Sequence, residues 1–78
     1  MIIFVKDLNA RTLILDISPR DSIIEIKNKI HEKVGIYTKF MVLIFAGIQL
    51  QNESKVCDCN IAKESTLHML ILPRFEGA

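Results

Sequence analysis

The sequence has few of the features that mark secreted or membrane proteins. Its two cysteines, Cys57 and Cys59, are two positions apart, and residues so close rarely form a disulfide without strain. A disulfide framework is therefore excluded, and we expect two reduced thiols in an intracellular protein of the cytoplasm or nucleus. The longest apolar runs, residues 2–5 and 69–72, are far too short to cross a bilayer. We also expect no signal peptide before the first strand.

The sequence also lacks an excess of charge of either sign. Ten Lys and Arg residues and nine Asp and Glu residues give a net charge of +1, so nothing indicates nucleic acid or an anionic membrane as a partner. With 78 residues there is room for one domain. A domain of this size buries only about 60% of its unfolded surface. Because 50% of the residues are hydrophobic, we expect a dense core or an apolar surface patch kept for a partner.

The first seventeen residues have the pattern of a β-hairpin. Residues 1–6 are rich in β-branched and aromatic side chains, which are typical of strands. Asp and Asn in residues 7–10 favour a turn, because their side chains bond to nearby backbone. Residues 12–17 resume the strand pattern, with Leu13 and Leu15 on one face.

A helix is predicted after this hairpin. Ser22 is followed three residues later by Glu25, which is the spacing of a capping box. Gly35 ends the helix, since glycine adopts a left-handed conformation without a Cβ clash. The residues that recur at helical spacing and form one apolar stripe are Ile23, Ile26 and Ile30. The residues predicted to lie mostly off that stripe are Lys27, Asn28, Lys29, Glu32 and Lys33.

The second half of the chain is predicted to contain three strands. Residues 40–45 and 48–50 flank a tight turn at residues 46–47, and residues 66–72 form the last strand. Residues 51–60 are polar and predicted to be irregular. The order hairpin, helix, hairpin, strand predicts an α+β fold, in which one helix packs across one mixed sheet of four to five strands.

Two segments, residues 43–50 (LIFAGIQL) and 60–68 (NIAKESTLH), closely resemble ubiquitin. The resemblance extends over residues 1–72 without a gap and implies a β-grasp fold. It also implies a ubiquitin-like domain of residues 1–72 followed by a flexible tail or linker stub of residues 73–78. The positions that match buried positions of the family are all apolar: Ile3, Val5, Leu13, Leu15, Ile17, Ile23, Ile26, Ile30, Leu43, Leu50, Val56, Ile61, Leu67 and Met69. The positions that match sites of unusual dihedral angles are Gly35, Ala46, Gly47 and Asn60.

Departures from the family predict a domain less stable than ubiquitin. Ala10 and Glu53 stand where the family has glycine, and each costs about 1 kcal/mol if the same dihedral angles are kept. Cys59 replaces a tyrosine that ties down the neighbouring loop. Asn52 replaces an aspartate that pairs with a buried lysine, here Lys27, which is therefore expected to lack its ion partner.

The resemblance implies that partners bind a shallow apolar face of the sheet. Ile44 is out of phase with the core residue Leu43, so it points away from the helix. Val42, Ile48 and Leu72 are aliphatic where ubiquitin carries basic residues, which enlarges the apolar patch and removes charge steering. We expect partners with ubiquitin-binding helices or domains, proteasome receptors or ligases, or self-association through this face. The predicted partner-binding residues are Leu8, Val42, Ile44, Gly47, Ile48, His68, Leu70 and Leu72.

The C-terminal residues predict that the chain is not conjugated. Residues 75–76 are Phe-Glu where ubiquitin has its Gly-Gly end, and Pro73 stiffens the approach. We therefore expect a non-covalent interaction module of ubiquitin–proteasome pathways, which would be the N-terminal domain of any longer protein. The alternative is a divergent modifier that is trimmed to Gly77 and attached to lysines.

Lysines and thiols supply the remaining candidate sites. Cys57, Cys59 and His68 show no metal-ligand spacing and no nucleophile–base–orienter set, so we expect no catalysis, metal or cofactor. The lysines that match chain-forming lysines of ubiquitin, and are thus candidate modification sites, are Lys6, Lys27, Lys29, Lys33 and Lys63.

Overall fold

The computed structural model describes residues 1–72, so the predicted tail of residues 73–78 lies outside the described residues. The elements in chain order are β1 (Ile2–Lys6), β2 (Thr12–Asp16), α1 (Ile23–Val34), the 3₁₀ helix η1 (Thr38–Phe40), β3 (Met41–Phe45), β4 (Ile48–Gln49), the 3₁₀ helix η2 (Val56–Cys59) and β5 (Thr66–Ile71).

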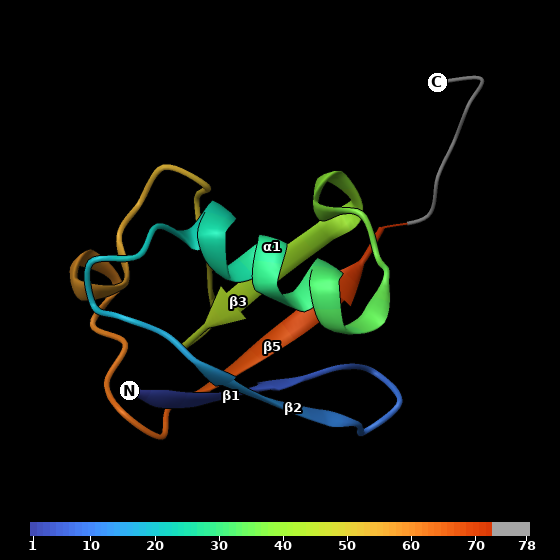
Figure 1. Cartoon of the computed structure of the whole chain (residues 1–78), viewed down its shortest axis with the longest axis horizontal. Coiled ribbons are helices and arrows are strands. Elements are labelled where there is room, and N and C mark those ends of the chain that lie inside the picture. The colour runs from blue at the N-terminus through green and yellow to red at the C-terminus, as the bar shows by residue number, and fades with distance from the viewer. Residues whose placement is uncertain (73–78) are drawn as a thin grey trace.

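The strands form one mixed sheet of five strands in the order β2-β1-β5-β3-β4, and α1 crosses one face of it (Figure 1). The central pair β1 and β5 is parallel, and the other neighbouring strands are antiparallel. This arrangement confirms the predicted α+β, β-grasp fold. Each observed strand is one residue shorter than predicted, at one end only, and Phe40 belongs to η1 rather than to a strand. The segment predicted to be irregular, 51–60, contains η2.

The helix begins and ends where its capping residues predict. The Glu25 amide donates to Ser22 Oγ over 3.4 Å, and Glu25 Oε1 accepts from the Ser22 amide over 2.9 Å, which completes the capping box. At the other end Gly35 is left-handed, with φ of 79°, and its amide donates to the His31 carbonyl over 2.7 Å. Both caps satisfy helix-terminal groups that would otherwise lack partners.

The core fills the space between α1 and the sheet. The predicted stripe of α1 is fully buried, at 0% exposure. Two predictions for the core were wrong or incomplete. The helical spacing places Lys27 off the stripe, but Lys27 is buried, as the family resemblance implied, and its Nζ bonds to Asn52 Oδ1. Met41 was omitted but is buried, in phase with Leu43 on β3. Leu13 is half-buried and packs against the core.

Backbone conformations match most of the predicted sites. Ala46, Gly47 and Asn60 all have positive φ, at 55°, 78° and 60°. Ala10 also has a positive φ of 65°, so the strain expected for its Cβ is present. The same expectation for Glu53 was wrong, because Glu53 is not among the described residues with positive φ.

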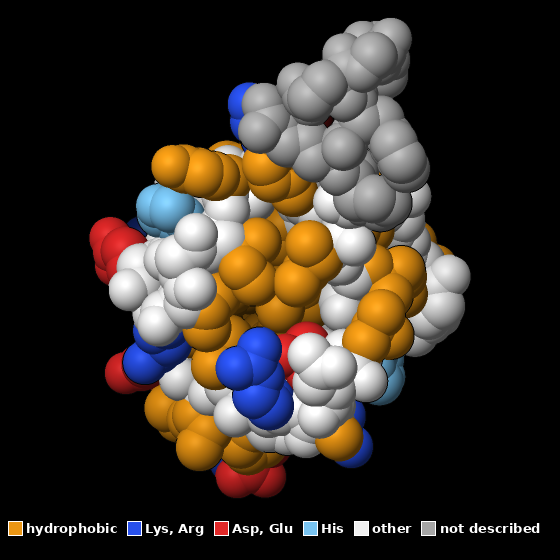
Figure 2. Space-filling model, turned by 90° about the vertical axis from the view of Figure 1, so that its right-hand side faces the viewer, with side chains coloured by type: hydrophobic (Ala, Val, Ile, Leu, Met, Phe, Trp, Pro, Cys, Tyr) orange, Lys and Arg blue, Asp and Glu red, His pale blue; other side chains and the backbone are white. Residues whose placement is uncertain are grey.

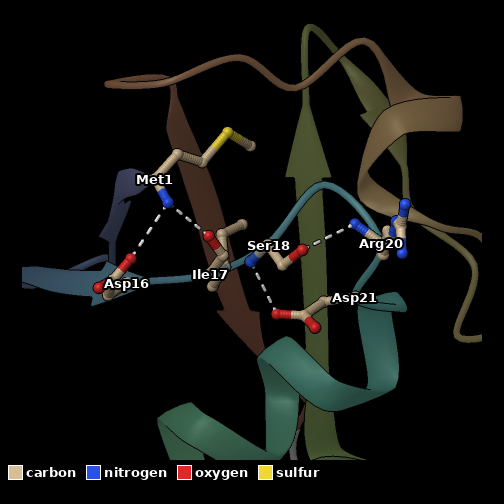
Figure 3. A network of polar contacts seen from close by, with 6 residues as sticks. All are labelled: Met1, Asp16, Ile17, Ser18, Arg20 and Asp21. Carbon is tan, nitrogen blue, oxygen red and sulfur yellow. Dashed lines mark hydrogen bonds and ion pairs between the residues drawn. The ribbon is translucent and has the colours of Figure 1, made fainter.

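The N-terminal residue ties the start of β1 to the end of β2 (Figure 3). The Met1 ammonium donates to Asp16 Oδ1 over 3.1 Å and to the Ile17 carbonyl over 2.6 Å. Immediately afterwards, the Ser18 amide donates to Asp21 Oδ2 over 2.9 Å and closes the turn that leads into α1. These contacts fix the register of the hairpin and the point at which the chain crosses from sheet to helix.

Candidate protein-interaction face

Strands β3 and β5 place four of the predicted binding residues directly opposite one another. In their antiparallel register Val42 pairs with Leu70, and Ile44 pairs with His68. Directly opposed residues point to the same face of a sheet, so these four side chains form one group. The residues between them, such as Leu43 and Met69, are buried beneath α1. The group therefore lies on the face away from the helix, as predicted from the alternation.

This group, Val42, Ile44, His68 and Leu70, is called the sheet face below. His68 is exposed and its three aliphatic members are half-buried. A half-buried aliphatic residue is fixed in position by its neighbours yet still presents carbon atoms to a partner. These three aliphatic side chains are thus partly accessible on the side of the sheet away from α1.

Leu8 and Leu72 extend the sheet face toward one end of the molecule. The parallel register of β1 and β5 ends with Lys6 opposite His68, and Leu8 follows two residues later in the turn. Leu8 is 79% exposed and Leu72 is 49% exposed. The Leu72 amide donates to the Phe40 carbonyl over 2.7 Å, which holds it beside β3.

Figure 2 shows the end of the molecule where α1 finishes and the β1–β2 turn lies. Hydrophobic side chains gather in the middle of this end. The apolar surface that Leu8 and Leu72 extend therefore reaches toward an end of the domain that is itself apolar.

The turn that carries Leu8 is organised by Asp7. Its Oδ1 accepts from the Asn9 and Arg11 amides over 2.9 and 3.0 Å, and its Oδ2 accepts from Arg11 Nε over 3.2 Å. Desolvation acts to raise the pKa of Asp7, but the bonds from Arg11 and Asn9 outweigh it and hold that pKa below its ordinary value. Leu8 thus projects from a structured turn.

Gly47 and Ile48 lie at the edge of this region, and Ile48 points elsewhere. The two-residue strand β4 pairs Gln49 with Ile44 and Ile48 with Phe45. Ile48, 66% exposed, therefore shares its side of the sheet with Phe45, and both line a hollow that also contains Cys59. The register of β4 therefore places Ile48 and Ile44 on opposite sides of the paired strands β3 and β4. Gln49, which the sequence reasoning missed, is the neighbour of Ile44, and only the register of β4 identifies it.

The candidate modification lysines differ in accessibility. Lys6, Lys33 and Lys63 are exposed, and Lys29 is half-buried. Lys27 is 6% exposed, and its Nζ donates to Asn52 Oδ1 over 2.7 Å. Lys27 therefore bonds to a neutral amide oxygen, in place of the carboxylate that its match in the family pairs with. Burial lowers the pKa of Lys27, and the charge of Glu53 partly opposes that change.

The two cysteines, Cys57 and Cys59, both lie in η2. Cys57 is exposed and Cys59 is half-buried, and both are free. No group of three His, Cys, Asp or Glu side chains that could hold a metal occurs in this part of the chain. Among the described residues no helix has the length and apolar character to span a membrane.

A five-stranded mixed sheet with a parallel central pair, crossed by one helix, defines a β-grasp domain of the ubiquitin-like class. The model of the ubiquitin family matches residues 3–74. The chain belongs to the ubiquitin family.

Relatives of two kinds match the chain. The ubiquitin-like protein NEDD8 of Dictyostelium discoideum is 35% identical over 74 residues, which cover 95% of this chain and 96% of that protein. The ubiquitin-like protein 1 of Schizosaccharomyces pombe is 34% identical over 74 residues, which cover 95% of this chain and 95% of that protein. The E3 ubiquitin-protein ligase parkin of Drosophila melanogaster is 27% identical over 70 residues, which cover 90% of this chain but only 14% of that protein.

Proposed function

We propose that this domain is a non-covalent protein-interaction module of ubiquitin-dependent pathways, which binds partners through the sheet face. The observation that carries this proposal is the register of β3 and β5, which gathers Val42, Ile44, His68 and Leu70 on the side away from α1. The core needs none of these side chains, since it is complete beneath the other face. An apolar group on the helix-free face is the surface that a partner could cover.

The expected partner presents apolar side chains on a helix. The sheet face is shallow and carries one titratable residue, His68, so hydrophobic contact dominates its recognition. Leu8 at one side can close over a bound side chain, because it projects from the turn at 79% exposure. Partners with ubiquitin-binding helices or domains, proteasome receptors and ligases have the required chemistry, and a second copy of this chain is the remaining candidate.

The proposal is tested by NMR titration of the ¹⁵N-labelled chain with a synthetic ubiquitin-binding helix. We expect the amide signals of Ile44, His68 and Leu70 to shift and saturate. Ile44→Ala should weaken binding at least about tenfold, because a residue at the centre of an interface carries much of its binding energy.

Ile14→Ala is the matched control for Ile44→Ala. Ile14 is also an aliphatic strand residue, is 58% exposed, and lies on the edge strand β2. This variant should bind as the unaltered chain does. Equal weakening by both variants, or the absence of any shift on the sheet face, would overturn the proposal.

The lengths of two relatives favour a second candidate function, that of a divergent modifier attached to lysines after C-terminal processing. NEDD8 and ubiquitin-like protein 1 are covered over nearly their whole length, whereas parkin contains the matching part as a small share. The residues that decide between these functions, 73–78, lie outside the described structure.

A thioester assay separates the two functions. The chain is incubated with ubiquitin-activating enzyme and ATP, with and without a cell lysate that supplies processing proteases. The interaction module predicts no reducible adduct under either condition, and the modifier predicts an adduct after processing. Truncation of the chain at Gly77 is the informative control, because it supplies the processed end directly.

We further propose that the domain acts without catalysis and works in the cytoplasm or nucleus. Support for the location comes from the free thiols at Cys57 and Cys59, which suit a reducing compartment. A fractionation experiment that recovered the chain from a secretory compartment would contradict the placement.

A further inference from the structure

A hollow of about 320 Å³ lies beside β4 and η2. It is formed where the chain leaves β3, returns through β4 and enters η2, at the end of the molecule far from the β1–β2 turn (Figure 1). Its volume is within the range of sites that bind small organic groups. The lining residues are Phe45, Ala46, Ile48, Gln49, Leu50, Gln51, Ser54, Asp58, Cys59 and Asn60.

The apolar part of the lining includes the ring of Phe45 and the aliphatic side chains of Ala46, Ile48 and Leu50. Phe45 is half-buried against the core, Leu50 is buried, and Ile48 is 66% exposed at the mouth. The half-buried thiol of Cys59 adds to this surface. Burial, and then the nearby Asp58 and Cys57, raise the pKa of Cys59, so the thiol is neutral and behaves as a small hydrophobic group. These walls favour an uncharged ring over a polar chain.

The polar part of the lining favours a hydrogen-bond donor over an anion. Asp58 is the charged residue of the lining, and it takes part in neither ion pair of the described residues. Its carboxylate accepts hydrogen bonds and repels negative charge. The amides of Gln49, Gln51 and Asn60 accept or donate as the ligand requires. A ring that carries one neutral hydroxyl group satisfies both parts of this lining.

We propose that this hollow is a second binding site, which takes the unphosphorylated phenol ring of a tyrosine side chain presented by a partner protein. The two sites diverge at β4, where Ile48 lines the hollow and Ile44 belongs to the sheet face, while Gln49 borders both. A partner could occupy either site alone. The inference therefore goes beyond the function proposed for the sheet face and does not depend on it.

The probe for the experiment is N-acetyl-tyrosinamide, titrated into the ¹⁵N-labelled chain and followed by NMR. We expect saturable shifts at the amides of Ile48, Leu50 and Cys59, with Kd on the order of 1 mM, as suits a probe of this small size. The amides of Ile44 and His68 should remain unshifted. No saturable shift at the hollow, or an equal shift on the sheet face, would overturn the proposal.

Two related probes test the chemistry of the occupant. N-acetyl-phenylalaninamide lacks the donor and should bind several-fold more weakly. N-acetyl-phosphotyrosinamide carries an anion and should bind at least tenfold more weakly. Asp58→Asn should narrow the difference in affinity between the phosphorylated and unphosphorylated probes, because it removes the charge that repels the phosphate. Equal affinity for the phosphorylated and unphosphorylated probes in the unaltered chain contradicts the proposed selectivity.

Two variants test the location of the site. Cys59→Tyr fills the hollow and should abolish the shifts, and the matched Cys57→Ser, at the exposed neighbour, should leave them unchanged. Ile48→Ala keeps the test valid if Cys59→Tyr misfolds, since Ile48 is exposed and its truncation should weaken binding several-fold without unfolding the chain. Undiminished binding in a folded Cys59→Tyr variant would show that the probe binds elsewhere.

Discussion

Lys27 on α1 donates from its Nζ to Asn52 Oδ1 over 2.7 Å, and this bond joins the middle of the helix to the loop that precedes η2. The side chain of Lys27 is an ammonium group taken largely out of water, with a neutral amide as its partner. Such a group is held less tightly than one paired with a carboxylate, because a hydrogen bond between two charged groups is the stronger kind. A backbone bond joins the same two segments, since the Ile24 amide donates to the Asn52 carbonyl over 3.1 Å.

Asn52→Asp should therefore stabilise the domain. The new carboxylate stands within reach of Lys27 and should raise its pKa toward the ordinary value, with a gain of about 1 kcal/mol in the free energy of unfolding, as for a partly exposed ion pair. Asn52→Ala should have the opposite sign, since it leaves the ammonium group without that acceptor. Urea denaturation of the three chains measures both differences. A loss of stability in Asn52→Asp contradicts the argument.

The same pair predicts a pH dependence. Because the pKa of Lys27 is lower in the folded state than in the unfolded chain, the unfolded chain binds the proton more tightly. The contribution of Lys27 to stability should therefore rise with pH between its folded and unfolded pKa values. Unfolding free energies of the unaltered chain and of Asn52→Asp, measured at neutral and alkaline pH, should converge as the pH approaches the unfolded value. A gap that widens with pH would be inconsistent with a lowered pKa.

Much of the fold could be predicted because local and long-range signals agree. Ser22 and Glu25 predict the start of α1, Gly35 predicts its end, and the spacing of its isoleucines predicts the buried face. The position of Lys27 could not be predicted from that spacing alone. A long stem allows a lysine at the border of an apolar stripe to be buried along its length, and only the loop around Asn52 provides the acceptor.

The candidate site was predictable only in part, for a related reason. Alternation along β3 and β5 places Ile44 and Leu70 on the helix-free face whatever their partners are. The side on which Ile48 lies depends on the turn between β3 and β4, where a shift of one residue reverses every side chain. The hollow beside Cys59 depends on η2, a 3₁₀ helix in a segment whose composition predicts an irregular chain.

The left-handed residue Ala10 offers a stabilising change. Its φ of 65° brings its Cβ close to the backbone, and glycine has no Cβ. Ala10→Gly should raise the free energy of unfolding by up to about 1 kcal/mol, reduced by the greater freedom of glycine in the unfolded chain. Ala62→Gly is the control, because Ala62 is exposed and not left-handed, and it should be neutral or destabilising. Thermal melts rank the three chains, and equal changes in both variants would remove the conformational explanation.

The capping box of α1 predicts a coupled change in stability and titration. Ser22→Ala removes a helix cap and should cost about 1 kcal/mol. The bonds from the Ser22 amide and hydroxyl hold the pKa of Glu25 below its ordinary value, so Ser22→Ala should raise that pKa. Because the folded pKa is lowered, the contribution of Glu25 is complete above the unfolded pKa and is lost as the pH falls through the folded value.

NMR titration of the Glu25 carboxyl carbon and denaturation in urea measure these two effects. Ser54→Ala is the control, since Ser54 has no side-chain hydrogen bond in the described structure and should change stability by less than about 0.5 kcal/mol. If the pKa of Glu25 is the same in Ser22→Ala as in the unaltered chain, the predicted link between the helix cap and the titration of Glu25 is wrong.

The sheet face predicts an unusual response of partner binding to salt. Val42 and Leu72 present carbon where the family resemblance places basic groups, so an acidic ubiquitin-binding helix gains little from charge attraction. Its affinity should change by less than about threefold between about 0.05 and about 0.5 M ionic strength, a range over which exposed charges become screened. Val42→Arg with Leu72→Arg should tighten binding at low salt and make it fall steeply as salt is added. Ile14→Arg adds one charge on the edge strand β2, two strands from β5 on the same side of the sheet, and should steepen the salt dependence much less than the double variant does. A steep salt dependence in the unaltered chain would mean that other charges steer the partner, and that the apolar sheet face is not the main contact.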